Sequence, residues 1–150
     1  MDGGMYADIE TVPYQVKQPI KFNKYQQPIP ISSTAPKAKD VITVSGYGYA
    51  HEEPSGGRLK IGHTELITSA KCRQNYTVTD NMLCSSIELL DLCFGDSGGP
   101  AVYRGELVGV ISQGCEYTAP NVFTKVANYH DWIRRVAGLD RENEKHYNSV

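Results

Sequence analysis

The sequence contains no long apolar run, no internal repeat and no excess of charge of one sign. Every uninterrupted apolar stretch is only a few residues long, which excludes a membrane-spanning helix. The 15 lysines and arginines nearly balance the 17 aspartates and glutamates, which leaves a net charge of −2. We therefore expect neither a strongly basic nucleic-acid binder nor a protein that binds anionic membranes.

A secretory signal is also missing from the sequence as it stands. Residues 1–8 have neither the basic segment nor the apolar segment that such a signal needs. The 150 residues amount to about one domain, and a hydrophobic content of 40% is ordinary for a globular protein. A chain of this size buries roughly two thirds of its unfolded surface, so it is long enough to build a core.

The cysteines show neither C-x-x-C spacing nor a histidine at zinc-finger spacing, so we expect no metal site. An even number of cysteines suits two disulfides, for which three pairings are possible, and four buried free thiols are the alternative. The tripeptide NYT makes Asn75 a candidate for N-glycosylation. Together these features favour an oxidising compartment. The four cysteines are Cys72, Cys84, Cys93 and Cys115.

The first forty residues hold five of the eight prolines. Proline fixes φ and lacks an amide donor, so this stretch cannot form a long helix or a central strand. We expect a short strand over residues 9–12. An extended connector follows to residue 40, and its apolar residues predict that it lies along a packed surface.

The middle of the chain has the pattern of short strands separated by turns. We expect strands over 41–48, 59–70 and 121–126. A hairpin of 101–103 and 106–112 is expected around the turn Arg104-Gly105. This spacing of strands is typical of an all-β barrel or sandwich.

The C-terminal part of the chain has a helical rather than a strand-like residue pattern. Apolar residues from 126 to 136 recur at helical spacing, which predicts an amphipathic C-terminal α-helix that begins near the capping residue Asn128. Residues 140–150 mix charges of both signs and carry almost no apolar side chains, so we expect a flexible tail.

The segment 91–100, DLCFGDSGGP, is the one most suggestive of chemistry. It places three glycines around Ser97, and glycine allows turns that other residues resist. Such a turn can present the serine hydroxyl and direct successive backbone N–H groups at one point, as an oxyanion hole requires. A tight loop with a capping serine is the alternative interpretation.

Six segments of the chain resemble motifs of the trypsin/chymotrypsin-like serine proteases. The nucleophile motif of that family is similar to GDSGGP at 95–100. The resemblance continues through most of residues 6–136, with similarity to arthropod digestive trypsins and mite allergens. The other matching segments are DI at 8–9, VSGYG at 44–48, VTDNMLC at 78–84, LVGVIS at 107–112, and VFTKV at 122–126 followed by DWI at 131–133.

The resemblance implies a role for each matching residue. Ser97 matches the nucleophile, Asp8 the triad aspartate, and the amides of Gly95 and Ser97 the oxyanion hole. Asp91 matches the acid at the base of a pocket for Lys or Arg. The implied disulfides are Cys72–Cys84 and Cys93–Cys115, and the second would clamp the Ser97 loop to the pocket wall. The implied substrate pocket comprises Asp91, Leu92, Ser112, Gly114 and Asn121.

The family places a histidine upstream of the aspartate that Asp8 matches, and only seven residues precede Asp8 here. None of the four histidines stands in the matching motif, and His51 is an ordinary loop histidine rather than a substitute base. Serine is a weak nucleophile without an adjacent base. Loss of the histidine costs about 10⁶-fold in kcat in the subtilisin example, so we expect an inactive chain.

Other positions depart from the family pattern. The family pairs the aspartate that matches Asp96 with an amino group freed by cleavage. We therefore expect an unpaired or solvated Asp96 and a partly disordered loop around Gly95. Leu92 and Gln113 replace a small residue and a tryptophan. Asn121 replaces a pocket glycine, so its side chain is expected to fill the pocket and to hydrogen-bond Asp91.

Two functions follow from the resemblance. One is a serine endopeptidase domain, truncated at its N-terminus and inactive, that acts on protein or peptide substrates. The other is a secreted pseudoprotease that binds a protein partner, which the altered pocket favours. Both imply an extracellular protein without a cofactor, and neither implies a nucleic-acid or membrane partner.

The implied fold is all-β, a trypsin-like antiparallel Greek-key β-barrel that forms the second half of a two-barrel fold, with most of the first barrel missing. The expected organisation is a strand remnant and connector over 1–40, the barrel over 41–127, a helix over 128–139 and a tail over 140–150. Because the absent barrel would leave apolar surface uncovered, we expect the chain to aggregate.

Overall fold

A computed structural model describes most of the chain between residues 22 and 139. The predictions for Asp8, His51, the strand over 9–12 and the tail over 140–150 fall outside the described residues. The described residues are the backbone of 5–6, and then 22–25, 27–49, 57–88, 90–116, 118–137 and 139.

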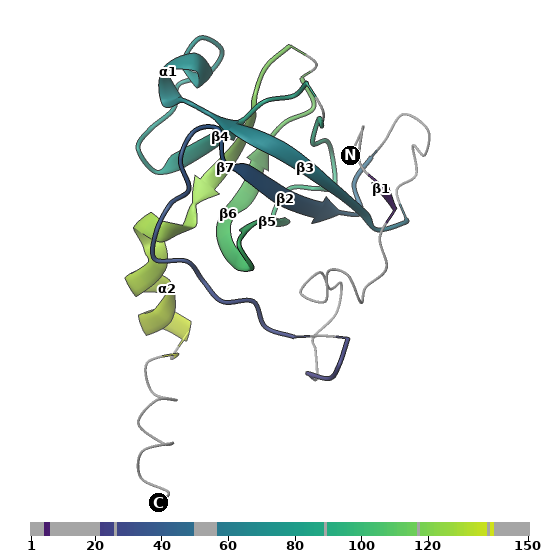
Figure 1. Cartoon of the computed structure of the whole chain (residues 1–150), viewed down its shortest axis with the longest axis vertical. Helices are drawn as coiled ribbons and strands as arrows, with labels where there is room; N and C mark the ends of the chain where they lie inside the picture. Colours follow the sequence, from purple (N-terminus) through teal and green to yellow (C-terminus); the bar gives the residue numbers. More distant parts are fainter. Residues whose placement is uncertain are drawn as a thin grey trace, which may run out of the picture.

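Six antiparallel strands form a closed β-barrel, and one two-residue strand is added beside them (Figure 1). The all-β prediction is therefore confirmed. The strands are β1 (Met5–Tyr6), β2 (Val41–Gly46), β3 (Lys60–Ile67), β4 (Met82–Ser85), β5 (Pro100–Tyr103), β6 (Glu106–Gln113) and β7 (Asn121–Lys125).

The order of strands in the sheet is β1-β3-β2-β5-β6-β7-β4, and a further pairing of β3 with β4 closes the barrel. Strands β5, β6 and β7 pair consecutively, and β4 lies beside β7. This is a Greek-key arrangement, as the resemblance implied. It brings the loop before β5 close to the loop after β6, although these loops are separate in sequence.

The strand expected over 59–70 is shorter than predicted. Strand β3 ends at Ile67, and α1 (Ser69–Cys72) follows at once. The hydroxyl of Thr68 accepts a hydrogen bond of 3.2 Å from the amide of Lys71. This N-cap satisfies a free amide at the start of the helix and so favours a helical turn over continued strand.

The predicted hairpin is confirmed, with β5 and β6 joined by Arg104-Gly105. Both turn residues have positive φ, 51° for Arg104 and 82° for Gly105. Two successive residues of positive φ are typical of a type I′ turn, whose twist matches that of paired strands. The hairpin therefore directs β5 and β6 along the barrel wall.

The barrel interior is filled by apolar side chains from most of the strands. Ile42 on β2, Ala101 on β5 and Phe123 on β7 have no exposed surface. Dispersion and burial of such residues stabilise the barrel. The cluster also contains Val44, Leu66, Leu90, Leu92, Val108 and Ile111. Leu90 and Leu92 lie directly before the Ser97 loop, so the core anchors one end of that loop.

The connector contacts the barrel before β2 begins. The amide of Leu107 donates to Pro30 and the amide of Ser32 donates to Leu107, at 2.8 and 3.0 Å. Ser32 is buried, whereas Phe22 at the start of the described connector is 66% exposed. The prediction that the connector lies along a packed surface thus holds for residues near 31 and fails at Phe22.

The chain leaves the barrel through a 3₁₀ turn, Val126–Tyr129, which leads into α2 (His130–Ala137). Asn128 is not the N-cap of α2. It lies within the 3₁₀ turn, and its amide donates to Asp80 and Asn81 at 3.1 and 2.7 Å. The predicted cap is wrong because these bonds use the Asn128 side chain to tie the turn to the segment before β4.

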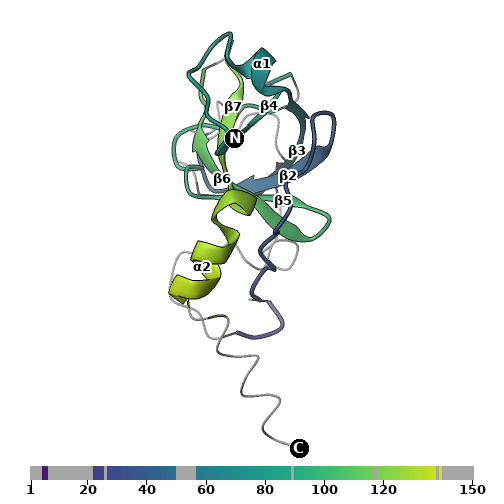
Figure 2. The same ribbon diagram turned by 90° about the vertical axis from the view of Figure 1, so that its left-hand side faces the viewer.

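Helix α2 projects away from the barrel (Figures 1 and 2). None of its residues is buried. Trp132 is 55% exposed and Val136 is 65% exposed, so much of the predicted apolar face meets solvent. None of the described helices is long and apolar enough to cross a membrane.

Candidate active site

Ser97 lies on an exposed turn that directly precedes β5. Three hydrogen bonds shape this turn, from Asp96 to Cys93, from Gly99 to Asp96 and from Gly98 to Ile111, all between 2.8 and 3.0 Å. Gly95 and Gly98 have φ of 91° and 83°, which side chains with a Cβ rarely adopt. The glycines are therefore needed to expose Ser97 at this position.

The carboxylate of Asp96 is buried below the turn, with 1% of the residue exposed. It accepts hydrogen bonds from the amides of Gly48 at 2.9 Å and Cys93 at 3.2 Å. The expectation of an unpaired or solvated Asp96 is therefore wrong, whereas the partly disordered loop around Gly95 stays a prediction. Backbone amides supply donors to the carboxylate, and a hydrogen-bonded carboxylate is tolerated inside a protein.

The approach of Asp96 explains the two glycines around Tyr47. A Cβ on Gly48 would lie 2.5 Å from the carboxylate carbon of Asp96, and a Cβ on Gly46 would collide with one carboxylate oxygen. No heavier residue fits at either position without displacing the carboxylate. The VSGYG segment thus packs closely against the Asp96 carboxylate, which lies below the Ser97 turn.

A cavity of about 350 Å³ opens beside Ser97. Three of the predicted pocket residues line it, namely Leu92, Ser112 and Gly114. Asp91 and Asn121 do not line it. The remaining residues of the wall are Tyr76, Cys93, Phe94, Ile111, Gln113, Cys115 and Glu116.

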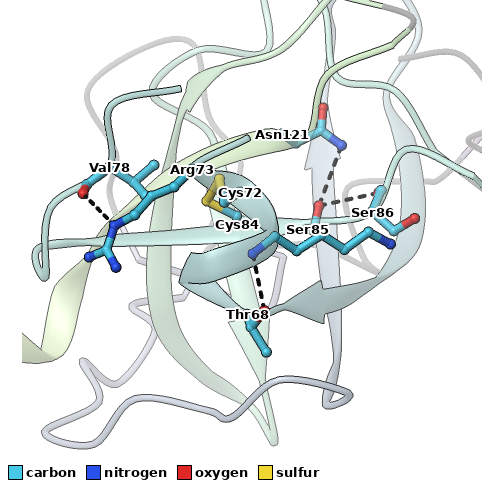
Figure 3. The surroundings of a disulfide bond; sticks show 9 residues. Thr68, Cys72, Arg73, Val78, Cys84, Ser85, Ser86 and Asn121 are labelled. Carbon is cyan, nitrogen blue, oxygen red and sulfur yellow. Dashed lines mark hydrogen bonds between the residues drawn. A yellow bond between two sulfur atoms is a disulfide. The ribbon is translucent and has the colours of Figure 1, made fainter. Parts of the chain in front are cut away.

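Asn121 is fully buried, and its amide bonds to the backbone of a neighbouring segment. Its oxygen accepts from the amide of Leu92 at 3.0 Å, and its nitrogen donates to the carbonyl of Leu90 at 3.0 Å. A longer bond of 3.4 Å reaches Ser85 (Figure 3). The predicted hydrogen bond to Asp91 is wrong, because these backbone groups use both ends of the amide.

Asn121 nevertheless occupies space at the inner wall of the cavity. A Cβ on Gly114, a lining residue, would lie 2.9 Å from the side-chain oxygen of Asn121. The amide is therefore directly behind the wall that Gly114 forms. A glycine at position 121 would leave that volume open.

Asp91 is 8% exposed, and its carboxylate turns toward the disulfide loop. It accepts a hydrogen bond of 3.2 Å from the amide of Cys115. It does not itself form the cavity floor.

Sequence reasoning missed Tyr76 and Glu116, which both line the cavity. Burial raises the pKa of Tyr76, and the charge of Glu116 and its hydrogen bond to the phenol raise it further, with a smaller effect from Asp91. The phenol of Tyr76 therefore stays protonated near neutral pH. These residues come from separate loops, and the sequence around each contains no motif that would have revealed the pair.

Phe94 was also missed. It lies three residues before Ser97, lines the cavity and is 78% exposed. A large apolar side chain in water beside a cavity is a contact point for an apolar ligand group. Its position directly before the nucleophile motif was the available signal.

Two disulfides join Cys72 to Cys84 and Cys93 to Cys115, so all four cysteines are paired. This is the pairing that the resemblance implied. Cys93 and Cys115 both line the cavity, and their Cα atoms are 4.2 Å apart. The bond therefore links the Ser97 loop to the opposite wall, as expected.

Neither of the two described histidines is near Ser97 in the cavity wall. His63 Nδ1 lies 3.0 Å from the hydroxyl of Thr43 on the barrel surface. His130 Nδ1 contacts the carboxylate of Asp131 at 2.9 Å on α2. Within the described ranges, no group of three or more acidic, histidine or cysteine residues could hold a metal ion.

A serine on a glycine-rich turn, set beside a cavity on a six-stranded barrel, defines the architecture of a chymotrypsin-like serine hydrolase domain. The family model for trypsin matches residues 7–133. The chain therefore belongs to the trypsin family.

Curated relatives support this assignment over part of their length. Kallikrein-11 of Mus musculus is 35% identical over 136 residues, which cover 81% of this chain and 48% of the relative. Tissue-type plasminogen activator of Homo sapiens is 45% identical over 113 residues, covering 61% of this chain and 20% of the relative. The chain spans about half the length of kallikrein-11, and a smaller share of the activator.

Solved structures show the same barrel. Neuropsin, a serine protease of mouse brain, superposes with a TM-score of 0.70 at 28% identity, covering 78% of this chain and 56% of neuropsin. A scabies mite inactivated protease paralogue superposes with a TM-score of 0.71, also at 28% identity, covering 83% of this chain and 59% of the paralogue.

Proposed function

We propose that this barrel is the nucleophile-bearing half of a serine endopeptidase site, with Ser97 as the attacking residue. The observation that carries the proposal is the exposed Ser97 turn beside a 350 Å³ cavity. Among the hydrogen bonds between described residues, the amides of Gly95 and Ser97 are not donors. Both amides are therefore available to a carbonyl oxygen of a bound peptide.

The reaction class is acyl transfer to the serine hydroxyl. Ser97 Oγ would attack a peptide carbonyl, its proton would pass to a histidine, and the amine of the cleaved peptide would leave. Asp8 would orient that histidine. None of the four histidines stands in the family motif, so the 150 residues alone are proposed to be inactive.

A second function is a protein-binding pseudoprotease. The observation that favours it is Asn121, whose buried amide sits behind the cavity wall where a glycine would leave space. Leu92 makes the same region more apolar. A solved relative from scabies mite is itself described as an inactivated protease paralogue. In this function the cavity binds a side chain of a partner protein, and the partner's backbone is not cleaved.

Either function is proposed to operate outside the cell. Two disulfides hold the barrel, and disulfides persist in oxidising compartments. The ligand in both cases is a protein or peptide, because the available amides of Gly95 and Ser97 and the cavity beside them suit a peptide carbonyl and its neighbouring side chain.

A serine-directed phosphonate tests the inactivity of the chain. We expect no stoichiometric labelling of Ser97 in the intact 150-residue protein, and peptide hydrolysis no faster than that of S97A. Labelling that S97A abolishes would overturn this expectation.

Joining the amino-terminal half of mouse kallikrein-11 to this chain separates the two functions. In a folded, disulfide-bonded fusion, phosphonate labelling of Ser97 that S97A abolishes supports the endopeptidase. Absence of labelling in the same folded fusion supports the pseudoprotease. If the intact fusion cleaves Lys and Arg substrates as fast as its N121G variant, Asn121 does not block the pocket.

A further inference from the structure

The turn that follows α1 carries the sequence Asn75-Tyr76-Thr77, which the proposed chemistry does not use. We propose that Asn75 carries an N-linked glycan and that this glycan stands at the rim of the Ser97 cavity, where it screens the cavity from large ligands. The modification itself is independent of the proposed function. Only its screening role rests on the cavity being a ligand site.

The acceptor is accessible on the described surface. Asn75 and Thr77 are both exposed, and neither belongs to a helix or a strand. The backbone amide of Asn75 donates to the carbonyl of Cys72 at 3.1 Å, which leaves the side chain for modification. An exposed N-x-T turn is the usual form of an acceptor site.

The residue between Asn75 and Thr77 connects the site to the cavity. Tyr76 is partly buried, and both it and Glu116 line the cavity. Asn75 is the chain neighbour of this lining tyrosine, and its Cα lies about 3.8 Å from that of Tyr76, which places the proposed attachment point close to the cavity. A branched sugar chain attached there extends over the region beside the opening.

The turn is held in place on both sides, which fixes the attachment point. The disulfide from Cys72 to Cys84 ties the end of α1 to β4 (Figure 3). The guanidinium of Arg73 donates to the carbonyl of Val78 at 3.4 Å and spans the turn. α1 and this turn lie at the end of the barrel opposite α2 (Figure 1).

The modification requires a polyprenyl-pyrophosphate-linked oligosaccharide and its transferase, both of which belong to a secretory compartment. The side-chain nitrogen of Asn75 forms a bond to the anomeric carbon of the first N-acetylglucosamine. The bond from that carbon to the pyrophosphate oxygen breaks, the nitrogen loses one proton, and the lipid pyrophosphate leaves. No oxidation or reduction takes place.

Expression of the whole chain behind a secretory leader in eukaryotic cells tests occupancy. We expect an intact mass that exceeds the polypeptide mass and returns to it after peptide-N-glycosidase treatment, apart from conversion of Asn75 to Asp. N75Q and T77A should lose the added mass, whereas T77S should retain it because serine also completes the acceptor. A secreted, disulfide-bonded wild-type chain without added mass would overturn the proposal.

A thiol reporter in the cavity tests screening. Ser112 is exposed and lines the cavity, so S112C offers a thiol there. We expect a polyethylene-glycol maleimide to label S112C several-fold more slowly before deglycosylation than after it, while a small maleimide reacts equally in both. S33C, on the exposed connector, is the matched control and should show no difference.

If the large maleimide labels glycosylated and deglycosylated S112C equally fast, the screening role is overturned. The proposal that Asn75 carries a glycan is not affected by that result. The phosphonate experiment on Ser97 does not depend on the glycan. Failure of the proposed enzyme chemistry and failure of the glycan proposal are therefore told apart.

Discussion

At the scale of single residues, Asn121 shows how one buried side chain shapes a cavity that it does not line. Its amide bonds to two backbone groups of the segment before the Ser97 loop. The residue thus holds the inner wall of the cavity in place and fills volume behind it. The same contacts make it a stability determinant.

We expect N121A to lower the free energy of unfolding by about 1–3 kcal/mol, because it leaves a buried amide and a buried carbonyl without partners. Urea denaturation of the purified chain measures the change. N128A is the matched control, since Asn128 is an exposed amide whose hydrogen bonds water can replace. Equal losses for the two variants would contradict the role given to Asn121.

The sequence could predict residues that lie within one contiguous motif, and it could not predict contacts between motifs. Ser97 and its glycines occupy a single ten-residue segment. Tyr76 and Glu116 meet only because the barrel and its disulfides bring two distant loops together. Asp96 was mispredicted because its donors include the amide of Gly48, a group that no side-chain pattern reveals.

At the scale of elements, Asp40 joins the connector to the barrel just before β2. Its carboxylate accepts from the amide of Lys37 at 2.7 Å and from the hydroxyl of Tyr103 at 2.9 Å. These two hydrogen bonds hold the pKa of Asp40 below its ordinary value of 3.8, and the bond from the Lys37 amide has the larger effect. The contact therefore depends on the ionised form.

Since the pKa of Asp40 is lower in the folded state, its contribution to stability is complete above pH 3.8 and is lost as the pH falls through the lower folded value. We expect Y103F and D40N to lose less stability than the wild type over that acid range. Urea midpoints measured across the range provide the test. E65Q removes an exposed carboxylate on β3 and should follow the wild-type curve.

The elements themselves were predicted well where a local pattern decides them. The hairpin was recognisable from its turn residues, and β2 from its β-branched run. The end of β3 and the start of α2 were misplaced because side chains of Thr68 and Asn128 form specific hydrogen bonds there. Such bonds depend on the local backbone path rather than on periodicity.

At the scale of the whole molecule, the disulfide between Cys72 and Cys84 ties the segment after α1 to the barrel. The cysteines are 12 residues apart, and closing a loop of about this length stabilises a protein by about 3 kcal/mol in the chain-entropy account. We expect C72S/C84S to lose an amount of that order in urea denaturation. Loss of less than about 0.5 kcal/mol, the usual effect of a surface substitution, would contradict the expectation.

The exposed side chains of α2 predict self-association of the isolated chain. Trp132 and Val136 are more than half exposed on the same short helix, and exposed apolar patches favour association. We expect sedimentation velocity to show concentration-dependent oligomers that W132S/V136S reduces. R135S changes an exposed polar residue of α2 and should not reduce them. A wild-type chain that stays monomeric at all concentrations would refute this.

The position of Trp132 also decides how the protein can be observed in solution. It is the one tryptophan in the sequence, and it lies on a helix that projects from the barrel. Because Trp132 is 55% exposed, we expect its emission in the folded monomer, at concentrations too low for association, to be close to that of an indole in water. Tryptophan fluorescence will thus change little when the barrel unfolds. Unfolding must instead be followed by circular dichroism or tyrosine fluorescence.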